Sequence, residues 1–315
     1  MVPCTMSAKL QPLRLMVFLV ILTAAVLETA TAFSVGVTSI SRESFAVDDF
    51  TCSDAIRLVP PYVESPVILQ LLNEHYLEME TNFLLVMKQH APQRIGSLYL
   101  VCLDDASAAT IDALFGLACV TIDGVTSFRS LMLIRVKIIV CLLRGGRDVL
   151  VSDNDALWLA DPIPDLHAIE GDVLFQRGVF PRMYGDPIYG VTLCTGFALY
   201  RAGGEGMETF LTLMEKESNK HGDGQKGLNE AVYQLHLKWD YNATNSDMRN
   251  VESTGVGRGV LTALPGNFVV ALLPHNRYPR TCIESMASSD AIIVHCFPRR
   301  NRKAVMKKLK LWLVE

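Results

Sequence analysis

VLVSDNDALWL, Val149–Leu159, is the stretch that decides the fold. Its apolar start predicts a buried parallel strand that ends at Ser152, and Asp153 and Asp155 follow directly. In an open α/β sheet, ligands bind at the edge formed by the carboxyl ends of the strands. Two carboxylates two residues apart at that edge are hard oxygen ligands that suit a divalent cation. Because Asp and Asn are also common turn formers, a solvated turn is the alternative interpretation.

The segments around this stretch alternate between strand-like and helix-like patterns. Short apolar runs predict strands, and apolar residues recurring every three or four positions predict helices. We expect strands at Pro66–Leu72, Ser97–Leu103, Asp172–Gln176, Thr192–Tyr200 and Ala291–Phe297, and helices at Glu74–Lys88, Ala106–Leu117, Ser130–Leu143 and Met207–Glu217. This order predicts an α/β fold, with a Rossmann-like, mostly parallel sheet and helices on both faces.

Residues 1–32 have the pattern of a signal peptide or signal anchor. Basic residues precede the apolar run Leu15–Leu27, and an Ala-x-Ala pattern follows it. The run is shorter than the roughly 20 residues that span a bilayer, which favours a cleaved signal over an anchor. Either would place the chain in the secretory pathway, in the Golgi lumen or outside the cell, and the sequon Asn242–Thr244 fits that compartment.

Residues 33–315 are expected to form one domain. Half of all residues are hydrophobic, so the chain is able to bury a sizeable core, and the sequence has no low-complexity linker or repeat. The net charge is only −4, which gives no sign of a nucleic-acid partner. Any membrane contact is expected through the N-terminal segment alone.

Seven cysteines remain after removal of a signal peptide, so at least one stays unpaired within a monomer. Cys102, Cys119 and Cys141 lie in apolar surroundings, and we expect them to behave as small buried residues. The sequence has no C-x-x-C pair, which argues against a structural zinc site.

Several further polar residues are candidates for the same sheet edge. Asp104 follows a predicted strand, although it also suits the N-cap of the next helix. Gln225 and Asn229 share one helix face and would either hold a polyhydroxylated ligand or be solvated. His295 ends a predicted strand and precedes a basic helix that contains Lys303. A histidine and a lysine are what a carboxylate pair lacks for binding a metal and a phosphate.

Taken together, these motifs resemble a known family. The order is a helix bearing Lys137, the strand with D-x-D-x-x-W, then T-G-F, then G-Q-x-x-x-N, then V-H and a lysine-rich end. This order is similar to that of the nucleotide-diphospho-sugar transferases of the plant xylosyltransferase and arabinosyltransferase type. The resemblance runs from about Val67 to Trp312, and it implies the GT-A glycosyltransferase fold.

The resemblance also implies a site and a reaction. Its members use a metal ion, Mn²⁺ or Mg²⁺, and a nucleotide-sugar donor, here expected to be a UDP-sugar, with a glycan or glycoprotein as acceptor. The implied metal ligands are Asp153, Asp155 and His295. Donor-binding residues would be Asp153, Asp155, Lys137, Asp104 and Lys303, and the sugar or acceptor would meet Thr195, Gly196, Gln225 and Asn229. The implied transfer retains anomeric configuration, and the sequence identifies no catalytic base or nucleophile.

Two departures from the family pattern keep alternatives open. Cys194 replaces the Asn expected before T-G-F, and Gly224 replaces an Asp expected before Gln225. These changes motivate a second reading, a domain that binds a nucleotide sugar or glycan without turnover. A haloacid-dehalogenase-like phosphatase is a weaker alternative because Leu157 stands where its motif wants Thr or Val. A calcium loop is weaker still, since its glycine and closing glutamate are missing.

Overall fold

The computed structural model describes residues 43–59, 63, 65–178, 192–239, 255–280, 282, 290–296 and 301–314. The segment 1–32 and the sequon Asn242–Thr244 lie outside the described residues. Within the described part of the chain, no helix combines the length and apolar character needed to cross a membrane.

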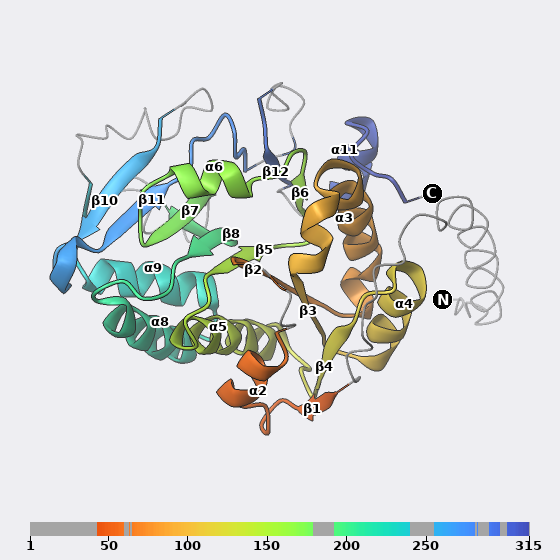
Figure 1. Cartoon of the computed structure of the whole chain (residues 1–315), viewed down its shortest axis with the longest axis horizontal. Helices are drawn as coiled ribbons and strands as arrows, with labels where there is room; N and C mark the ends of the chain where they lie inside the picture. Colours follow the sequence, from red (N-terminus) through yellow and green to blue (C-terminus); the bar gives the residue numbers. More distant parts are fainter. Residues whose placement is uncertain are drawn as a thin grey trace, which may run out of the picture.

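One ten-stranded sheet runs through the molecule (Figure 1). Its strands, in spatial order, are β1 (Ser44–Ala46), β4 (Cys119–Asp123), β3 (Leu98–Cys102), β2 (Val67–Leu72), β5 (Val149–Ser152), β8 (Thr192–Tyr200), β7 (Val173–Gly178), β11 (Val269–Leu272), β10 (Gly257–Leu261) and β9 (Leu237–Trp239). The first five strands in this order, β1, β4, β3, β2 and β5, are parallel to one another. β8 is antiparallel to both β5 and β7, while β11 is parallel to β7. The sheet is thus mostly parallel, as predicted.

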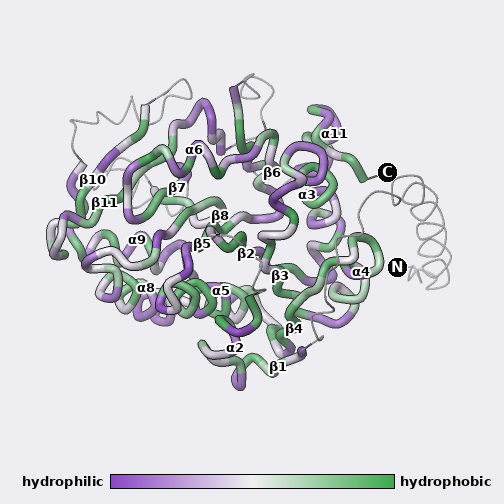
Figure 2. Tube along the Cα trace, viewed as in Figure 1, coloured by the Kyte–Doolittle hydropathy of each residue, from purple (hydrophilic) through white to green (hydrophobic). Residues whose placement is uncertain are grey.

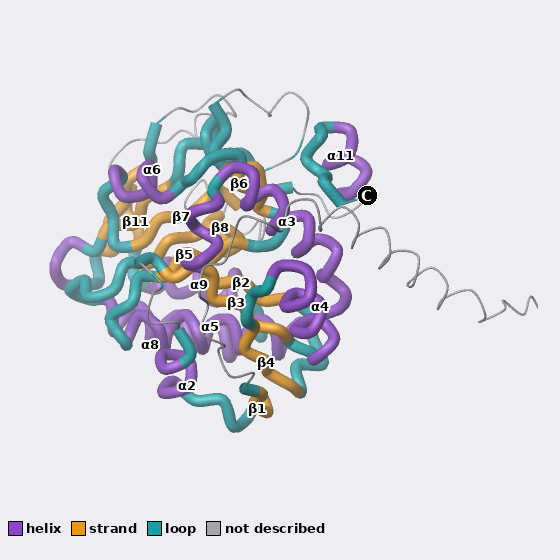
Figure 3. Tube along the Cα trace, turned by 45° about the vertical axis from the view of Figure 1, so that its right-hand side comes forward, coloured by secondary structure: helices purple, strands orange, loops and turns teal. Residues whose placement is uncertain are grey.

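Helices cover both faces of this sheet (Figure 3). Alternate residues of β2 show the division, since Val67 and Leu69 belong to one hydrophobic core and Ile68 and Leu72 to the other. The first core is shared with α2 (Cys52–Arg57), α5 (Phe128–Arg144), α8 (Met207–His221) and α9 (Gly224–Gln234). The second is shared with α3 (Leu77–His90), α4 (Asp105–Phe115), α6 (Ile163–Ala168) and α11 (Arg302–Lys308). Figure 2 shows the matching pattern, with hydrophobic strands β3 and β4 inside helices of mixed character.

A second, two-stranded sheet lies beside the carboxyl end of β5. It consists of β6 (Ala156–Trp158) and β12 (Ile293–His295), paired antiparallel with His295 opposite Ala156. The short 3₁₀ helices are η2 (Glu74–Tyr76), η3 (Pro92–Ser97) and η4 (Pro265–Asn267). This small sheet carries a residue from the far end of the sequence to the D-x-D turn.

Three disulfide bonds correct the expectation for the cysteines. Cys102 pairs with Cys119, and Cys141 pairs with Cys52, so these three residues are not simply small buried thiols. The third bond joins Cys282 to Cys296. Apolar surroundings suit a buried disulfide as well as a buried thiol, and the sequence did not separate the two. Among the cysteines that the structure describes, Cys194 is the unpaired one, and it is buried.

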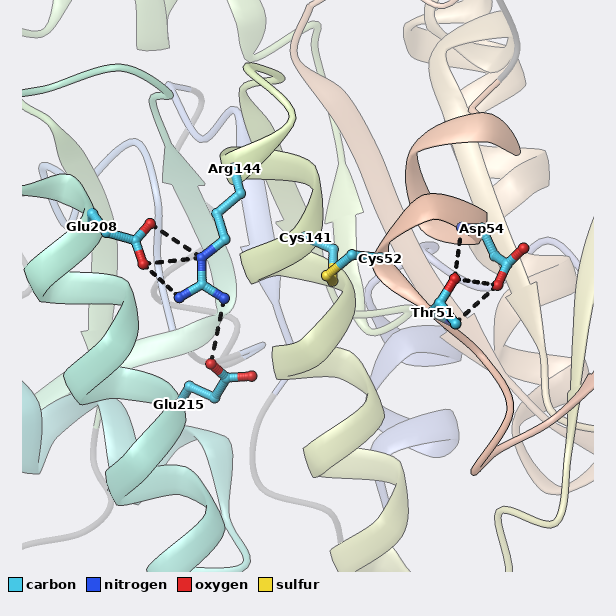
Figure 4. Close-up of a disulfide and its surroundings, with 7 residues drawn as sticks. All are labelled: Thr51, Cys52, Asp54, Cys141, Arg144, Glu208 and Glu215. Carbon is cyan, nitrogen blue, oxygen red and sulfur yellow. Dashed lines mark hydrogen bonds and ion pairs between the residues drawn. A yellow bond between two sulfur atoms is a disulfide. The ribbon is translucent and has the colours of Figure 1, made fainter.

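A disulfide links α5 covalently to α2 (Figure 4). On the other side of the helix, Arg144 contacts Glu208 and Glu215 of α8, with closest distances of 2.6 Å and 3.5 Å. At the opposite end, Ser127 and Ser130 form a reciprocal capping box that satisfies the first backbone N–H groups. α5 is therefore fixed at both ends and on both sides.

Candidate active site

The D-x-D turn is held by its own backbone and by the tryptophan that follows it. The amide of Asp153 donates to Gly196 O at 2.6 Å, and the amide of Ala156 donates back to Asp153 O at 2.8 Å. Below the turn, the buried Trp158 indole donates to Ser152 Oγ at 3.1 Å. These bonds place the Asp153 and Asp155 carboxylates at the carboxyl end of β5, as the sequence predicted.

His295 completes a cluster with the two carboxylates. One ligand atom from each of Asp153, Asp155 and His295 lies within 4.8 Å of the other two. His295 Nε2 is 3.1 Å from Asp155 Oδ1 and 3.8 Å from Asp153 Oδ2. Two carboxylates and one imidazole form a donor set that suits Mn²⁺ and accepts Mg²⁺. The structure therefore brings together all three metal ligands implied by the family resemblance.

Gly196 makes this close approach possible. A Cβ atom at this position would collide with His295 Cε1 and with Asp153 Oδ2. The glycine of the T-G-F motif thus leaves space for two of the three candidate ligands. Any side chain here would displace one of them.

The two buried members of the cluster perturb each other's protonation. Burial by itself raises the pKa of Asp155, but His295, Arg302 and Arg280 outweigh it and hold this pKa below its usual range. Burial and Arg280 lower the pKa of His295, but Asp155 outweighs both, so this pKa lies above its usual range. Asp155 and His295 thus stabilise each other's charged form in a buried setting.

Two arginines flank the carboxylates, one on each side. Arg135 of α5 pairs with Asp153 Oδ1 at 2.9 Å and also donates to Thr195 O. Arg302 of α11 pairs with Asp155 Oδ2 at 2.9 Å. Both arginine side chains are largely buried. Guanidinium groups in such positions provide planar, permanently charged donors that suit phosphate oxygens.

A surface pocket opens in front of this constellation. Its charged lining residues are Asp153, Asp155, Arg135 and Arg302. Apolar and aromatic residues also line it, namely Leu71, Tyr76, Phe128, Leu131 and Met132. Phe128 is half exposed at its rim. The lining thus combines charged and apolar side chains, which suits a ligand that has both anionic and apolar parts.

The predicted donor-binding cations have other neighbours. Lys303 pairs with Glu78 and lies 4.9 Å from the centre of the Trp312 ring, outside the set of described residues that line the pocket. Lys137 is two positions from Arg135, and that spacing turns it about 200° around the helix, away from the pocket. The structure brings Arg135 and Arg302 to the carboxylates in their place. Sequence reasoning missed both arginines because family resemblance directed attention to lysines.

Asp104 acts as a cap in the structure. Its carboxylate accepts from Ser107 N at 2.7 Å and from Glu74 N at 2.8 Å, so it begins α4 and ties it to η2. The capping alternative considered for Asp104 is therefore observed, and this residue is not among those lining the pocket.

The T-G-F and G-Q-x-x-x-N motifs hold each other. Asn229 is buried and bonds both backbone groups of Leu193, at 2.9 Å each. Gln225 Oε1 accepts from Thr195 N at 3.2 Å. The amide of Asn229 thus fastens α9 to β8 and is not solvated. Thr195 contributes its carbonyl to Arg135, which links this motif to the D-x-D turn.

Comparison with known proteins identifies the class of protein. A model of the nucleotide-diphospho-sugar transferase family matches residues 117–307, which include the D-x-D turn, T-G-F and His295. The match covers more than half of the chain, so the chain belongs to this family. Its members are glycosyltransferases, and this assignment removes the phosphatase alternative.

Solved structures of glycosyltransferases are similar to this chain at low sequence identity. The glycosyltransferase GlyE from Streptococcus pneumoniae is 14% identical over 78% of this chain and 60% of its own, with a TM-score of 0.46. The galactosyltransferase LgtC is 15% identical over 78% of this chain and 94% of its own, with a TM-score of 0.38. Mouse xyloside xylosyltransferase 1 is 13% identical over 55% and 83%, with a TM-score of 0.36. The chain thus spans 60% of the length of GlyE. No curated protein sequence matches it.

Proposed function

We propose that this protein is a metal-dependent glycosyltransferase. In this proposal it takes a sugar from a nucleotide sugar, with a UDP-sugar as the expected donor, and transfers it to a glycan or glycoprotein acceptor. The observation that carries the proposal is the clustering of Asp153, Asp155 and His295, two of which, Asp153 and Asp155, line one surface pocket. Family membership supplies the reaction class.

The three candidate ligands fit a hard divalent cation. Asp153 and Asp155 would hold Mn²⁺ or Mg²⁺ through carboxylate oxygens and His295 through Nε2, the nitrogen that faces them. When bound, the ion would neutralise the negative charge that develops on the leaving nucleoside diphosphate. Gly196 would assist metal binding because it leaves room for Asp153 and His295 to approach each other.

The pocket suits the two halves of such a donor. Arg302 and Arg135 lie beside the two carboxylates, where they would contact diphosphate oxygens and the transferred sugar. Tyr76 and Phe128 also line the pocket, and they provide aromatic side chains on which a nucleobase would stack. A uracil and a diphosphate together have this combination of apolar and anionic character.

Retention of configuration is the expected stereochemical outcome. Among the described residues that line the pocket, the carboxylates are Asp153 and Asp155, and each is engaged by an arginine. Neither is therefore suited to attack the sugar. Front-face attack by the acceptor, assisted by a leaving phosphate oxygen, needs no nucleophile from the protein.

The three disulfides support a place in the secretory pathway. Disulfides form and persist in oxidising compartments, and Cys52–Cys141 closes a long loop between α2 and α5. Together with the predicted signal segment and the sequon, they favour a Golgi or extracellular location.

Turnover of a panel of UDP-sugars tests the proposed function. Purified luminal protein, residues 33–315, is incubated with each donor and Mn²⁺, and release of UDP is measured with and without an acceptor mixture. We expect release from at least one donor, its loss with a chelator, and its loss in Asp155→Ala with the fold retained. UDP binding without release from any donor would favour the binding-only alternative. Metal-independent release would overturn the proposal.

A further inference from the structure

Gln176 of β7 is a buried amide that lies directly behind the candidate metal ligand His295. It is fully buried, and β7 pairs with β8 so that Gln176 stands opposite Cys194. Its Oε1 is 2.8 Å from His295 Nδ1, on the side of the imidazole away from the carboxylates. The function proposed above assigns no role to this residue.

Its surroundings determine the orientation of the Gln176 amide. Nε2 of Gln176 lies 3.0 Å from Tyr278 O and 3.0 Å from Pro279 O. Carbonyl oxygens only accept hydrogen bonds, so the amide nitrogen must face them, and it donates one hydrogen to each. The amide oxygen is therefore directed at His295 Nδ1, because the reversed amide would set its oxygen against two carbonyl oxygens.

The orientation of this amide in turn determines which imidazole nitrogen carries hydrogen. An amide oxygen only accepts, so His295 Nδ1 must be the donor. In the neutral imidazole the other nitrogen, Nε2, then has a free lone pair. Nε2 is the atom that faces Asp155 and Asp153, and a lone pair there is what a metal ion requires.

We propose that Gln176 is a positioning residue that holds His295 with Nδ1 protonated and Nε2 directed at the metal site. This inference rests on the proposed function, because it assumes that His295 binds the ion. Gln176 contacts no ligand itself and acts through the imidazole. Backbone carbonyls or carboxylates often take this role behind metal-binding histidines, and here a side-chain amide takes it.

A covalent brace keeps Gln176 and His295 in register. The backbone amide of His295 donates to Pro279 O at 3.0 Å, and this same carbonyl accepts from Gln176. The Cys282–Cys296 disulfide then ties the segment that follows Pro279 to the residue that follows His295. Gln176, Pro279 and His295 are thus joined to one another by hydrogen bonds, and the nearby disulfide restrains the two chain segments that carry Pro279 and His295. Cys194 Sγ, at 4.0 Å from Nδ1, is a weaker alternative acceptor.

Two substitutions at Gln176 separate positioning from packing. Gln176→Met keeps the length and removes every polar contact. Gln176→Glu keeps an oxygen for Nδ1 and loses the two donations to carbonyls. Both are expected to lower stability, because both leave Tyr278 O and Pro279 O without their donor. Only the Met variant loses the acceptor for His295.

Asn82→Leu is the matched control. Asn82 of α3 is an equally buried amide, and it bonds Leu311 O at 3.0 Å and Leu313 N at 2.6 Å. It is absent from the described metal-ligand cluster and from the pocket lining. Its removal should cost stability of the same kind without touching His295.

The test measures Mn²⁺ affinity, from the electron paramagnetic resonance signal of free Mn²⁺, alongside urea unfolding for all four proteins. We expect Gln176→Met to bind Mn²⁺ about 10- to 100-fold more weakly than the natural sequence, whereas Gln176→Glu and Asn82→Leu stay within a few-fold. Affinity then does not follow stability. Unchanged affinity in Gln176→Met, or equal losses in both Gln176 variants, would overturn the inference. Failure of the natural protein to bind Mn²⁺ would instead count against the proposed function.

Discussion

Helices α5 and α11 each bring an arginine to the same pair of carboxylates, but they are held very differently. α5 has 17 residues, a capping box and nine buried positions, and it is cross-linked to α2 by Cys52–Cys141. α11 has seven residues, lacks a side-chain cap, and buries Met306 alone. Arg135 therefore extends from a rigid support and Arg302 from a short one.

The partners of the two arginines differ in the same way. Arg135 bonds both Asp153 and Thr195 O, so it joins the D-x-D turn to β8. Arg302 pairs with Asp155, the carboxylate that a metal ion would also use. We infer that Arg135 is part of the permanent framework of the site, whereas Arg302 exchanges Asp155 for phosphate when metal and donor bind. In this inference Arg135 keeps its contacts in every state of the site, and Arg302 changes its partner when ligands bind.

Arg135→Met should have the largest effect. Without this guanidinium, the carboxylate of Asp153 loses its ion pair and the T-G-F carbonyl loses its donor. We expect turnover to fall about 1000-fold, a loss on the order of 4 kcal/mol in transition-state stabilisation, with Arg135→Lys in between. Steady-state turnover with the preferred UDP-sugar measures this. Activity within tenfold of the natural protein would show that Arg135 is not part of the framework.

Loss of the α2–α5 disulfide should be the next largest effect, and it acts on stability. Cys52 and Cys141 are 89 residues apart, so replacing both by Ala is expected to cost roughly 4 kcal/mol through the entropy of the unfolded chain. Cys102 and Cys119 are 17 residues apart, and the same replacement there should cost about 1.5 kcal/mol less. Urea unfolding compares the pair. Equal losses of stability would mean that the length of the closed loop does not determine how much each disulfide contributes.

Glu80 should make the stability of the protein depend on pH, because it is buried on α3, the helix that contacts α11. It lies fully buried on α3, the helix that also pairs with Lys303 through Glu78, and neither carboxyl oxygen has a hydrogen-bond partner among the described residues. Burial raises its pKa from 4.5 to about 8. The folded state thus keeps a proton that the unfolded state releases, so stability is full below pH 4.5 and falls as pH rises towards 8.

The expected loss at pH 7 is on the order of 3 kcal/mol. Glu80→Gln cannot ionise and should remove most of this slope from urea unfolding measured between pH 5 and 8. An unchanged slope in the variant would assign the pH dependence to another group.

Arg302→Met should have the smallest effect, with opposite signs for the two ligands. The variant loses a phosphate contact, so UDP affinity in the presence of Mn²⁺ should fall about tenfold. Mn²⁺ affinity without nucleotide should rise or stay the same, because Asp155 no longer pairs with a competing cation. Calorimetry with each ligand measures both. A parallel loss of both affinities would mean that Arg302 belongs to the framework, as Arg135 does.

The sequence predicted the position of the two carboxylates because strand ends are visible in it. Val149–Ser152 and Thr192–Tyr200 have the same bounds in the structure as in the prediction. Val149–Ser152 ends at the edge where ligands bind, so the position of the two carboxylates follows from a local pattern. His295 reaches them on a strand of the small second sheet, and β8 is antiparallel to β5, so their proximity was implied by the family resemblance and not by strand ends.

The two arginines and the disulfides depend on distant contacts, which local patterns do not contain. The apolar stripe of Ser130–Leu143 excluded Arg135, although this residue turns inward to meet a carboxylate on another strand. Cys141 looked like an ordinary core residue because its partner lies 89 positions earlier. Similarly, nothing around Gln176 in the sequence indicates an imidazole 119 positions later. Such contacts follow from the assembled fold.

Calorimetric titration of residues 33–315 with UDP, first with Mn²⁺ and then with a chelator, tests the central claim most directly. If Asp153, Asp155 and His295 bind an ion that holds a diphosphate, UDP should bind with Mn²⁺ and lose that binding when the metal is removed. Equal UDP affinity in the two conditions, or no binding in either, would contradict the account.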